Sequence, residues 1–208
     1  VAIGQSAMEN VSSGVALTGA IGIGKDALQS LNNTNANNTI AIGYQAAMRS
    51  DVGQGLVAVG KGALRNVSDS GSYSTAIGFD SGYYASGSYN TFVGSEAGKG
   101  GTTSAPYSSG QNNTFLGYSA GKDFTTGFNN VILGHNAGQN ITTAYRTVAI
   151  GSQALETDTT GHTNVAIGYD AMRLGAGSTN TVAIGQSALE YFSSTSGNTG
   201  AHSTAIGD

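Results

Sequence analysis

The chain has 208 residues, of which only 10% are charged, and it contains 33 glycines, one proline and no cysteine or tryptophan. Its net charge of −4, with no cluster of basic residues, excludes an electrostatic surface for nucleic acid or for anionic lipids. No apolar run approaches the roughly 20 residues of a membrane-spanning helix, so we expect no membrane insertion either.

One motif recurs twelve times along the chain, and each copy ends in a glycine. Successive glycines stand roughly 16 to 23 residues apart, and a period of this kind is typical of a stacked repeat architecture. The spacing is constant in every step from Gly117 to Gly185. The anchor glycines are Gly4, Gly24, Gly43, Gly60, Gly78, Gly94, Gly117, Gly134, Gly151, Gly168, Gly185 and Gly207.

The three residues before each anchor glycine form a predicted strand. In all twelve copies the first is Val, Ile or Thr and the third is Ile, Val or Leu, and such residues favour strands. The first and third side chains share one face, and the middle one takes the other. The middle residue is Ala in eight copies. In chain order the strands are expected at 1–3, 21–23, 40–42, 57–59, 75–77, 91–93, 114–116, 131–133, 148–150, 165–167, 182–184 and 204–206.

Each strand is followed by a predicted turn that begins at the anchor glycine. Glycine permits a positive φ and a close approach of the neighbouring copy. The residue two positions later is often short and polar, as in Ser6, Asp26 and Asp170. We expect it to accept backbone N–H groups in the turn, and we expect a second short strand to follow.

The sizes of two positions in the repeat compensate each other. Where the residue four after the glycine is large, as in Leu155, the residue two before the glycine is small, as in Ala149. Where the earlier residue is Phe115, the later one is Gly121. Protein interiors tolerate volume changes poorly, so we predict that the two positions meet in one packing layer.

Four asparagines stand in register four residues before their anchor glycines: Asn90, Asn113, Asn130 and Asn164. Asparagine suits a turn that enters a strand, and amides in register on stacked strands can form ladders. We expect a structural amide ladder here.

These features predict an all-β protein, a parallel β-solenoid of about twelve coils, each of roughly 16 to 23 residues. Residues 1–208 would form a single β-solenoid repeat domain with an irregular insertion at 99–111, which holds the only proline, Pro106. Because the sequence begins and ends inside copies of the motif, we expect a segment of a longer fibre.

The motif from Asn164 to Ala171 (NVAIGYDA) resembles the head repeats of trimeric autotransporter adhesins. The copies at 90–98 and 113–117 (NTFVGSEAG and NTFLG) resemble the related repeats of phage tail fibres and large bacterial surface proteins. The resemblance implies a left-handed parallel β-roll that assembles as a homotrimer. Adhesin heads use shorter coils than those of this chain.

The two apolar faces of each strand also point to partner chains. One face can fill the coil, and the other needs a cover. We expect the Val and Ile face to fill the coil and the small middle residues to face neighbouring chains around a shared axis. Phe92, Phe115 and Ile132 would widen that space in the middle of the fibre.

Chemical motifs are scarce. The three histidines, His135, His162 and His202, occupy unrelated positions in the repeat and do not have the spacing of metal ligands. The sequence has no nucleophile motif, no phosphate-binding loop and no paired carboxylates. We therefore expect no catalytic, cofactor-binding or metal-binding residues, and no enzyme.

Eleven of the sixteen aromatic residues lie between Tyr73 and Phe128. They either fill space beside small motif residues or form an exposed patch that contacts a host-surface glycan or receptor. The candidate contact residues are Tyr83, Tyr84, Tyr89, Tyr107, Phe124 and Phe128.

The leading hypothesis is a non-enzymatic shaft or head segment of an extracellular fibre, either a phage tail fibre or a bacterial surface adhesin, on a cell surface or virion appendage. Its partners would be further copies of itself and a host-surface glycan or receptor. The alternative is a flat-faced binding solenoid that binds ice or polysaccharide. Such a module needs a regular outward array, whereas the position after the anchor glycine varies through Gln5, Lys25, Tyr44 and Lys61.

Overall fold

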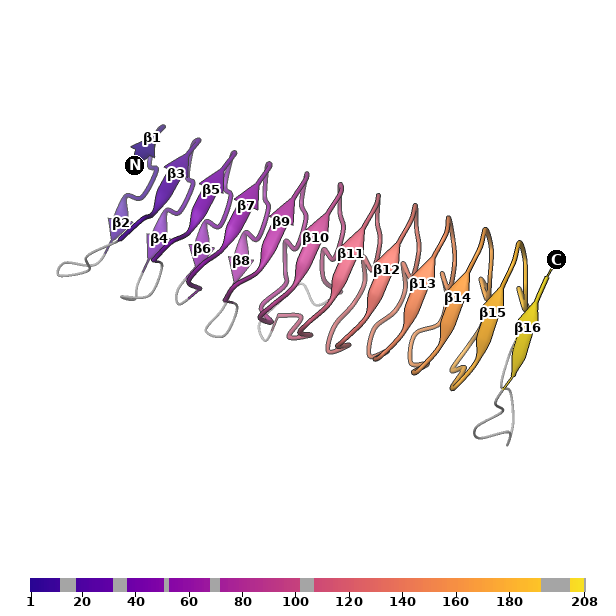
Figure 1. Cartoon of the computed structure of the whole chain (residues 1–208). Coiled ribbons are helices and arrows are strands. Elements are labelled where there is room, and N and C mark those ends of the chain that lie inside the picture. The colour runs from indigo at the N-terminus through magenta and orange to yellow at the C-terminus, as the bar shows by residue number, and fades with distance from the viewer. Residues whose placement is uncertain are drawn as a thin grey trace.

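The computed structural model describes residues 1–11, 18–31, 37–50, 53–67, 72–101, 107–191 and 203–207. The main element is a sheet of twelve parallel strands in the order β1-β3-β5-β7-β9-β10-β11-β12-β13-β14-β15-β16 (Figure 1). Their bounds are β1 (Ala2–Ile3), β3 (Ile21–Ile23), β5 (Ile40–Ile42), β7 (Val57–Val59), β9 (Thr75–Ile77), β10 (Thr91–Val93), β11 (Thr114–Leu116), β12 (Val131–Leu133), β13 (Val148–Ile150), β14 (Val165–Ile167), β15 (Val182–Ile184) and β16 (Thr204–Ile206).

Neighbouring strands pair at equivalent positions of the motif. Ala149 of β13 lies beside Ala166 of β14, which lies beside Ala183 of β15, and the pairing is parallel. Figure 1 shows the coils side by side from the indigo N-terminal end to the yellow C-terminal end. The predicted all-β parallel solenoid is confirmed, with an advance of about 4.8 Å per coil.

The predicted second strand of each coil occurs only near the N-terminus in the described part of the chain. There a four-stranded parallel sheet has the order β2-β4-β6-β8. From β9 onward the corresponding described segments are turns and irregular backbone, with an isolated bridge at Ala85. The bridge between Tyr145 and His162 lies at a different repeat position, six residues before the anchor glycine. The strands of this smaller sheet are β2 (Asn10–Val11), β4 (Ser30–Leu31), β6 (Arg49–Ser50) and β8 (Asn66–Val67).

The anchor glycines stack directly on one another. Gly134 has a φ of 140°, and a Cβ atom there would lie 2.3 Å from the carbonyl oxygen of Gly151. Gly151 stands in the same relation to Gly168. Both reasons expected from the sequence, the positive φ and the close approach, therefore apply.

The middle residue of each strand points into the coil. Phe115, Ile132 and Ala149 are fully buried within a single chain, while the strand residues on either side of them are half-buried or exposed. The expectation that Val and Ile fill the coil and that Ala faces other chains is wrong, and so is the one that Phe92 and its equivalents widen a shared axis. The turn supplies a large buried side chain such as Leu155, which leaves space for only a small residue opposite it.

The predicted packing layer is confirmed by two phenylalanines. A Cβ atom on Gly98 would lie 2.4 Å from the ring of Phe92, and one on Gly121 would lie 2.5 Å from the ring of Phe115. At Gly138 the corresponding distance to Ile132 is 3.2 Å. The large strand residue thus occupies the volume that a leucine or methionine on the turn fills in other coils.

The short polar residues of the turn do not act as caps. Within the described part of the chain, the side chains of Ser6, Asp26 and Asp170 accept no backbone N–H group. Instead, these residues adopt the left-handed conformation, with φ between 55° and 57°. Asparagine and aspartate tolerate this region better than most residues, which explains why they recur at this position.

The predicted amide ladder is present and buried. Asn113 donates from its backbone N and from Nδ2 to Oδ1 of Asn90, at 2.9 and 3.1 Å. Asn130 repeats both contacts with Oδ1 of Asn113, each at 3.1 Å. The ladder ends at Thr147, whose backbone N donates to Oδ1 of Asn130. Asn164 binds the backbone N of the strand-entry residue one coil later in the same way.

The predicted insertion at 99–111 joins the stack at both of its ends. Gly100 and Gly101 donate to the carbonyls of Lys122 and Phe124, and Ser108 donates to the carbonyl of Tyr84. Residues 102–106, which include Pro106, lie outside the described residues.

Candidate functional site

Two columns of side chains cover the outer face of the main sheet. They are the first and third residues of the strands, and Val131 and Leu133 of β12 are 43% and 38% exposed. Neither position carries a charged residue in any of the twelve motif copies. The third-residue column is Ile, Val or Leu in every copy, whereas the first-residue column contains threonine at Thr75, Thr91, Thr114 and Thr204. An apolar column that continues along the whole sheet is unusual on the surface of a monomer.

Phe124, one of the six predicted contact residues, is a core residue. It is fully buried, and its ring lies 5.4 Å from the rings of both Phe92 and Phe115. It occupies the tenth position before its anchor glycine, and Ile141 fills the same position in the next coil. The prediction that Phe124 contacts a ligand or receptor is therefore wrong.

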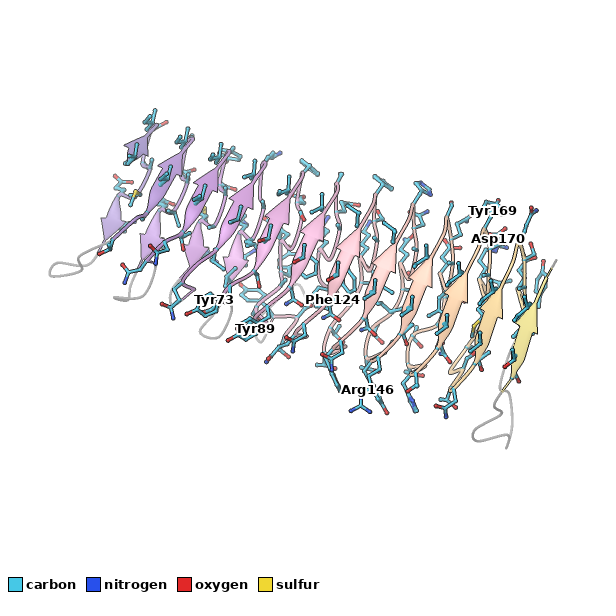
Figure 2. All side chains as sticks on the ribbon, in the orientation of Figure 1. Tyr73, Tyr89, Phe124, Arg146, Tyr169 and Asp170 are labelled. Carbon is cyan, nitrogen blue, oxygen red and sulfur yellow. The ribbon has the colours of Figure 1, made fainter. Side chains whose placement is uncertain are left out.

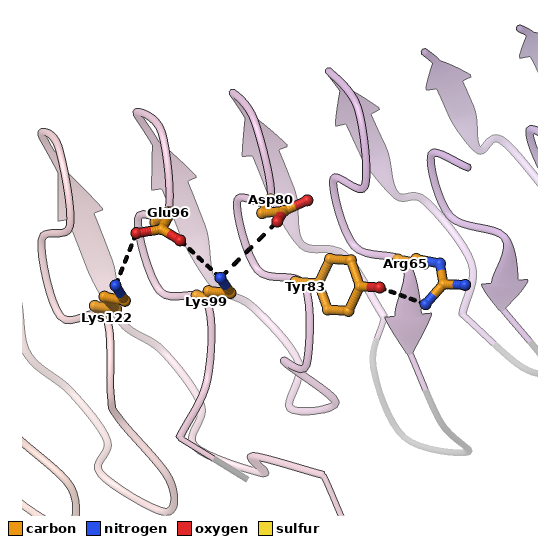
Figure 3. Close-up of polar contacts among 6 residues, drawn as sticks. All are labelled: Arg65, Asp80, Tyr83, Glu96, Lys99 and Lys122. Atoms are coloured by element: carbon orange, nitrogen blue, oxygen red, sulfur yellow. Dashed lines mark hydrogen bonds and ion pairs between the residues drawn. The ribbon is translucent and has the colours of Figure 1, made fainter. Parts of the chain in front are cut away.

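Tyr83, Tyr84 and Tyr107 form one half-buried group. Tyr83 packs edge-on against Tyr84 at 4.5 Å, and Tyr84 stacks with Tyr107 at 5.9 Å. The hydroxyl of Tyr83 accepts a hydrogen bond from Nη1 of Arg65 (Figure 3). Contacts within the chain therefore cover much of the surface of these three rings.

Tyr89 belongs to a separate, exposed pair. It stacks on Tyr73 at 5.6 Å, and both rings lie along the lower edge of the molecule in Figure 2, the edge that also carries Arg146. The predicted single aromatic patch is thus divided into separate groups.

Phe128 begins an aromatic column that the sequence analysis missed. It stacks on Tyr145 at 5.1 Å, and Tyr145 stacks on His162 at 4.6 Å. All three occupy the sixth position before an anchor glycine, as does Gln111 one coil earlier. An alignment on that position would have revealed the column, because the spacing between its members is the same in each step.

Main-chain hydrogen bonds hold this column in register. The residue after each member donates to the carbonyl of the member one coil earlier: Asn129 to Gln111, Arg146 to Phe128, and Thr163 to Tyr145, at 3.0 to 3.1 Å. The main-chain hydrogen bonds between neighbouring coils therefore set the positions of the rings.

A hollow of about 210 Å³ opens where the aromatic column ends. It is lined by Ser109, Gln111, Asn112, Thr126 and Phe128. Phe128 is 37% exposed, and the four polar residues are exposed as well. Within the described part of the chain, none of their four side chains forms a hydrogen bond. The hollow thus combines an aromatic wall with uncharged donors and acceptors that have no partners.

A row of ion pairs crosses three neighbouring coils on the turn side (Figure 3). Glu96 binds Lys122 at 2.8 Å and Lys99 at 2.7 Å, and Lys99 lies 3.9 Å from Asp80. Hydrogen bonds from Lys122 and Lys99 hold the pKa of Glu96 below its usual value. Burial acts to lower the pKa of Lys99, but the hydrogen bond to Glu96 and the charges of Glu96 and Asp80 act together in the opposite direction, and the pKa is raised. Such a mutually neutralised row serves to join coils.

Asp158 is a fully buried carboxylate, and sequence reasoning did not single it out. Its Oδ1 accepts the N–H groups of Gly161 and Gly177 at 2.8 and 2.9 Å, and Asn164 donates to its Oδ2 at 3.3 Å. Burial raises its pKa despite these bonds. It occupies the repeat position that Phe124 and Ile141 hold in the two preceding coils, so a charge that directly follows two apolar residues at this position was the available signal.

The described residues offer little chemistry of other kinds. No group of three or more His, Cys, Asp or Glu residues among them could hold a metal ion. His135 stacks on Tyr118 and His162 on Tyr145, whereas His202 lies outside the described residues. In the described ranges, no helix is long and apolar enough to cross a membrane.

Comparison of the chain with family models, curated proteins and solved structures found no match.

Proposed function

We propose that this chain is a non-enzymatic structural and adhesive segment of an extracellular fibre, and that it functions as a homotrimer. The observation that carries the proposal is the uncharged outer face of the main sheet, where the third strand residue is Ile, Val or Leu in every copy and the first is Val, Ile or Thr. A surface of this kind needs a cover in water.

The cover that fits best is another copy of the same chain. Both columns repeat once per coil and lack charge in every motif copy, so a partner with ionic contacts gains nothing from them. A second copy presents the same third-residue column of aliphatic side chains with the same period, so that these side chains can interdigitate along the sheet. Three-fold symmetry and the left-handed coil come from the resemblance to adhesin heads alone.

The shape of the chain supports a role in a fibre. The two ends of the chain lie at opposite ends of the solenoid (Figure 1). A rod of this kind separates whatever is attached at its two ends, and its continuous backbone ladder leaves few sites for a protease. A phage tail fibre or a bacterial surface appendage would use both properties.

The test compares the mass of the assembly in two double variants by native mass spectrometry. Leu133→Lys with Ile150→Lys places two charges in the third-residue column of the outer face, and we expect it to yield folded monomers. The control, Tyr169→Lys with Gln186→Lys, changes two exposed residues that follow anchor glycines, and should leave the assembly intact. Circular dichroism checks that both variants fold.

A folded monomer for the unmodified chain at micromolar concentration would contradict the proposed assembly. That result would favour the alternative, a flat-faced module that binds ice or polysaccharide and leaves its outer face free. A dimer would retain the buried outer face and reject the three-fold symmetry.

A further inference from the structure

We propose that the hollow beside Phe128 is a binding site for a single ring of a neutral sugar, such as a hexose or an N-acetylhexosamine at the end or edge of a glycan. This inference deepens the adhesive part of the proposed function. It does not depend on the oligomeric state of the chain.

The first argument is the free face of Phe128. Its ring is nearly parallel to that of Tyr145, at an interplanar angle of 5°, so one face is covered. The opposite face is directed toward the preceding coil, where the column continues with Gln111 in place of an aromatic residue. Both Phe128 and Gln111 line the hollow, so the hollow borders the column at the point where its aromatic residues end. A flat ligand with an apolar face can occupy that position.

The second argument is the set of polar groups around that face. Gln111 and Asn112 border the hollow with their amides, Ser109 of the same coil adds a hydroxyl, and Thr126 adds another from the next coil. Amides and hydroxyls both donate and accept hydrogen bonds. Because their side chains have no partners within the described chain, a ligand would not have to break contacts to bind them.

The third argument is the match to the chemistry of a sugar. A pyranose ring has one face of C–H groups, which packs on an aromatic ring, and a rim of hydroxyls, which both donate and accept. The hollow has one aromatic wall and an uncharged polar rim. Its volume of about 210 Å³ is below the roughly 300 Å³ of the smallest drug-sized sites and suits one ring. The absence of charged lining residues selects a neutral sugar over an acidic one.

The site is also pre-organised. Main-chain hydrogen bonds fix Gln111 to Asn129 and Phe128 to Arg146 across the coils. Asn112 donates from its backbone to the carbonyl of Ser88 at 3.2 Å. Ordering the backbone in advance lowers the entropic cost of binding, which matters for a ligand with so few contacts.

The experiment is a saturation-transfer and chemical-shift titration by NMR on the unmodified chain. The probes are the methyl glycosides of glucose, galactose, mannose, N-acetylglucosamine and N-acetylgalactosamine, with the methyl glycoside of glucuronic acid as the acidic comparison. We expect at least one neutral glycoside to bind with a millimolar Kd and the acidic one to bind more weakly.

Variants locate the site. Phe128→Ala should weaken binding by roughly tenfold, which is what the loss of one aromatic contact is worth, and Phe128→Tyr should retain it. Gln111→Ala removes a side chain without internal hydrogen bonds, so it should weaken binding without altering the thermal unfolding curve. Tyr169→Ala, an exposed tyrosine on the opposite edge from Arg146 in Figure 2, is the matched control and should bind as the unmodified chain does.

Three results would overturn the inference. One is the failure of every neutral glycoside to bind at millimolar concentration. The second is binding that is unchanged in both Phe128→Ala and Gln111→Ala, and the third is binding that favours the acidic glycoside. Native mass spectrometry of the same samples gives the oligomeric state, so a monomer that binds sugar would reject only the proposed assembly, and a trimer that does not bind would reject only this site.

Discussion

Phe115 and Gly121 share one volume inside their coil: a Cβ atom on Gly121 would lie 2.5 Å from the phenylalanine ring. Other coils fill the same volume from the opposite side, with Leu155 from the turn and Ala149 from the strand. The layer therefore accepts one large side chain from either position.

This relationship predicts a strong coupling between two substitutions. Gly121→Leu alone should lower the free energy of unfolding by about 1 to 3 kcal/mol through overpacking, and Phe115→Ala alone should lower it by about 3 to 5 kcal/mol through a cavity. The double variant should recover much of the combined loss, because Leu155 tolerates the left-handed φ of 54° at the same position. Denaturant unfolding measures all three.

The control for this cycle pairs Gly121→Leu with Leu155→Ala, which lies two coils away. Sites without shared contacts add within about 0.5 kcal/mol. If the pair Gly121→Leu and Phe115→Ala is also additive, the shared layer is disproved.

The stacked anchor glycines predict a severe effect of a single methyl group. In Gly134→Ala the new Cβ would meet the carbonyl oxygen of Gly151 at 2.3 Å, at a φ of 140°. We expect a loss of at least about 3 kcal/mol. Gly207→Ala is the control, because its φ is 124° but a Cβ there meets no atom within 4 Å. Thermal unfolding that is equally affected in both variants would mean that backbone strain, and not the close approach, requires the glycine.

The amide ladder predicts that Asn113 contributes more than an ordinary buried side chain. Asn113→Ala removes the acceptor for the backbone N–H of Asn130 and the donor to the carbonyl of Gly127. Each unsatisfied buried group costs about 1 to 3 kcal/mol, so we expect a loss of roughly 2 to 5 kcal/mol. Thr114 is the adjacent exposed residue and serves as the control. Thr114→Ala should lower the free energy of unfolding by much less. Equal midpoints in urea for the two variants would contradict a ladder that stabilises the fold.

Asp158 predicts an unusual dependence of stability on pH. Its pKa in the folded chain is raised above the usual 3.8 by burial, so the folded state binds the proton more tightly than the unfolded state does. The stability contributed by this group is therefore present below its usual pKa and is lost as pH rises through the raised value. Lowering the pH from about 7 to about 4.5 should favour the unmodified chain relative to Asp158→Asn.

The measurement is the difference in unfolding free energy between the two proteins at each pH. The other carboxylates are common to both, and their effects cancel in the difference. A difference that is constant with pH would show that Asp158 has the same proton affinity in the folded and unfolded chains. A difference that shrinks on acidification would show that the folded chain binds the proton more weakly, and either result would contradict the prediction.

The repeat made the architecture predictable from sequence. The β-branched pairs, the anchor glycine and the constant step between glycines each follow from strand alternation and backbone sterics, so the strand positions and the parallel register could be inferred. The inside and outside of each strand could not be assigned, because both faces are apolar. Nothing local distinguishes Ala149 from Val148, and the volume of Leu155 across the coil decides that Ala149 faces inward.

The candidate site was predicted only in part, for a related reason. Phe124 and Phe128 are four residues apart and chemically identical, yet one lies in the core and the other lines the hollow. Phe124 occupies the same repeat position as Ile141, and Phe128 occupies the same repeat position as Tyr145. The repeat position of each phenylalanine therefore decides where its ring lies. Aromatic abundance along the sequence carries no such information. Whether the side chain of Gln111 finds a hydrogen-bond partner depends on residues of neighbouring coils. It therefore cannot be inferred from the local sequence either.

Because most main-chain hydrogen bonds among the described residues join one coil to the next, they run along the solenoid axis, the direction in which the proposed fibre would be pulled. Under tension the coils are links in series, so the weakest contact between two coils fails first while the others stay closed. Each detached coil of about 17 residues releases about 55 to 60 Å of slack at the extended length of roughly 3.3 to 3.6 Å per residue. The remaining edge of the sheet is a ready template on which that coil can wind again when the load falls. Such a rod would lengthen in steps, one coil at a time, and shorten again when the load falls. The other coils would stay folded while one coil detaches.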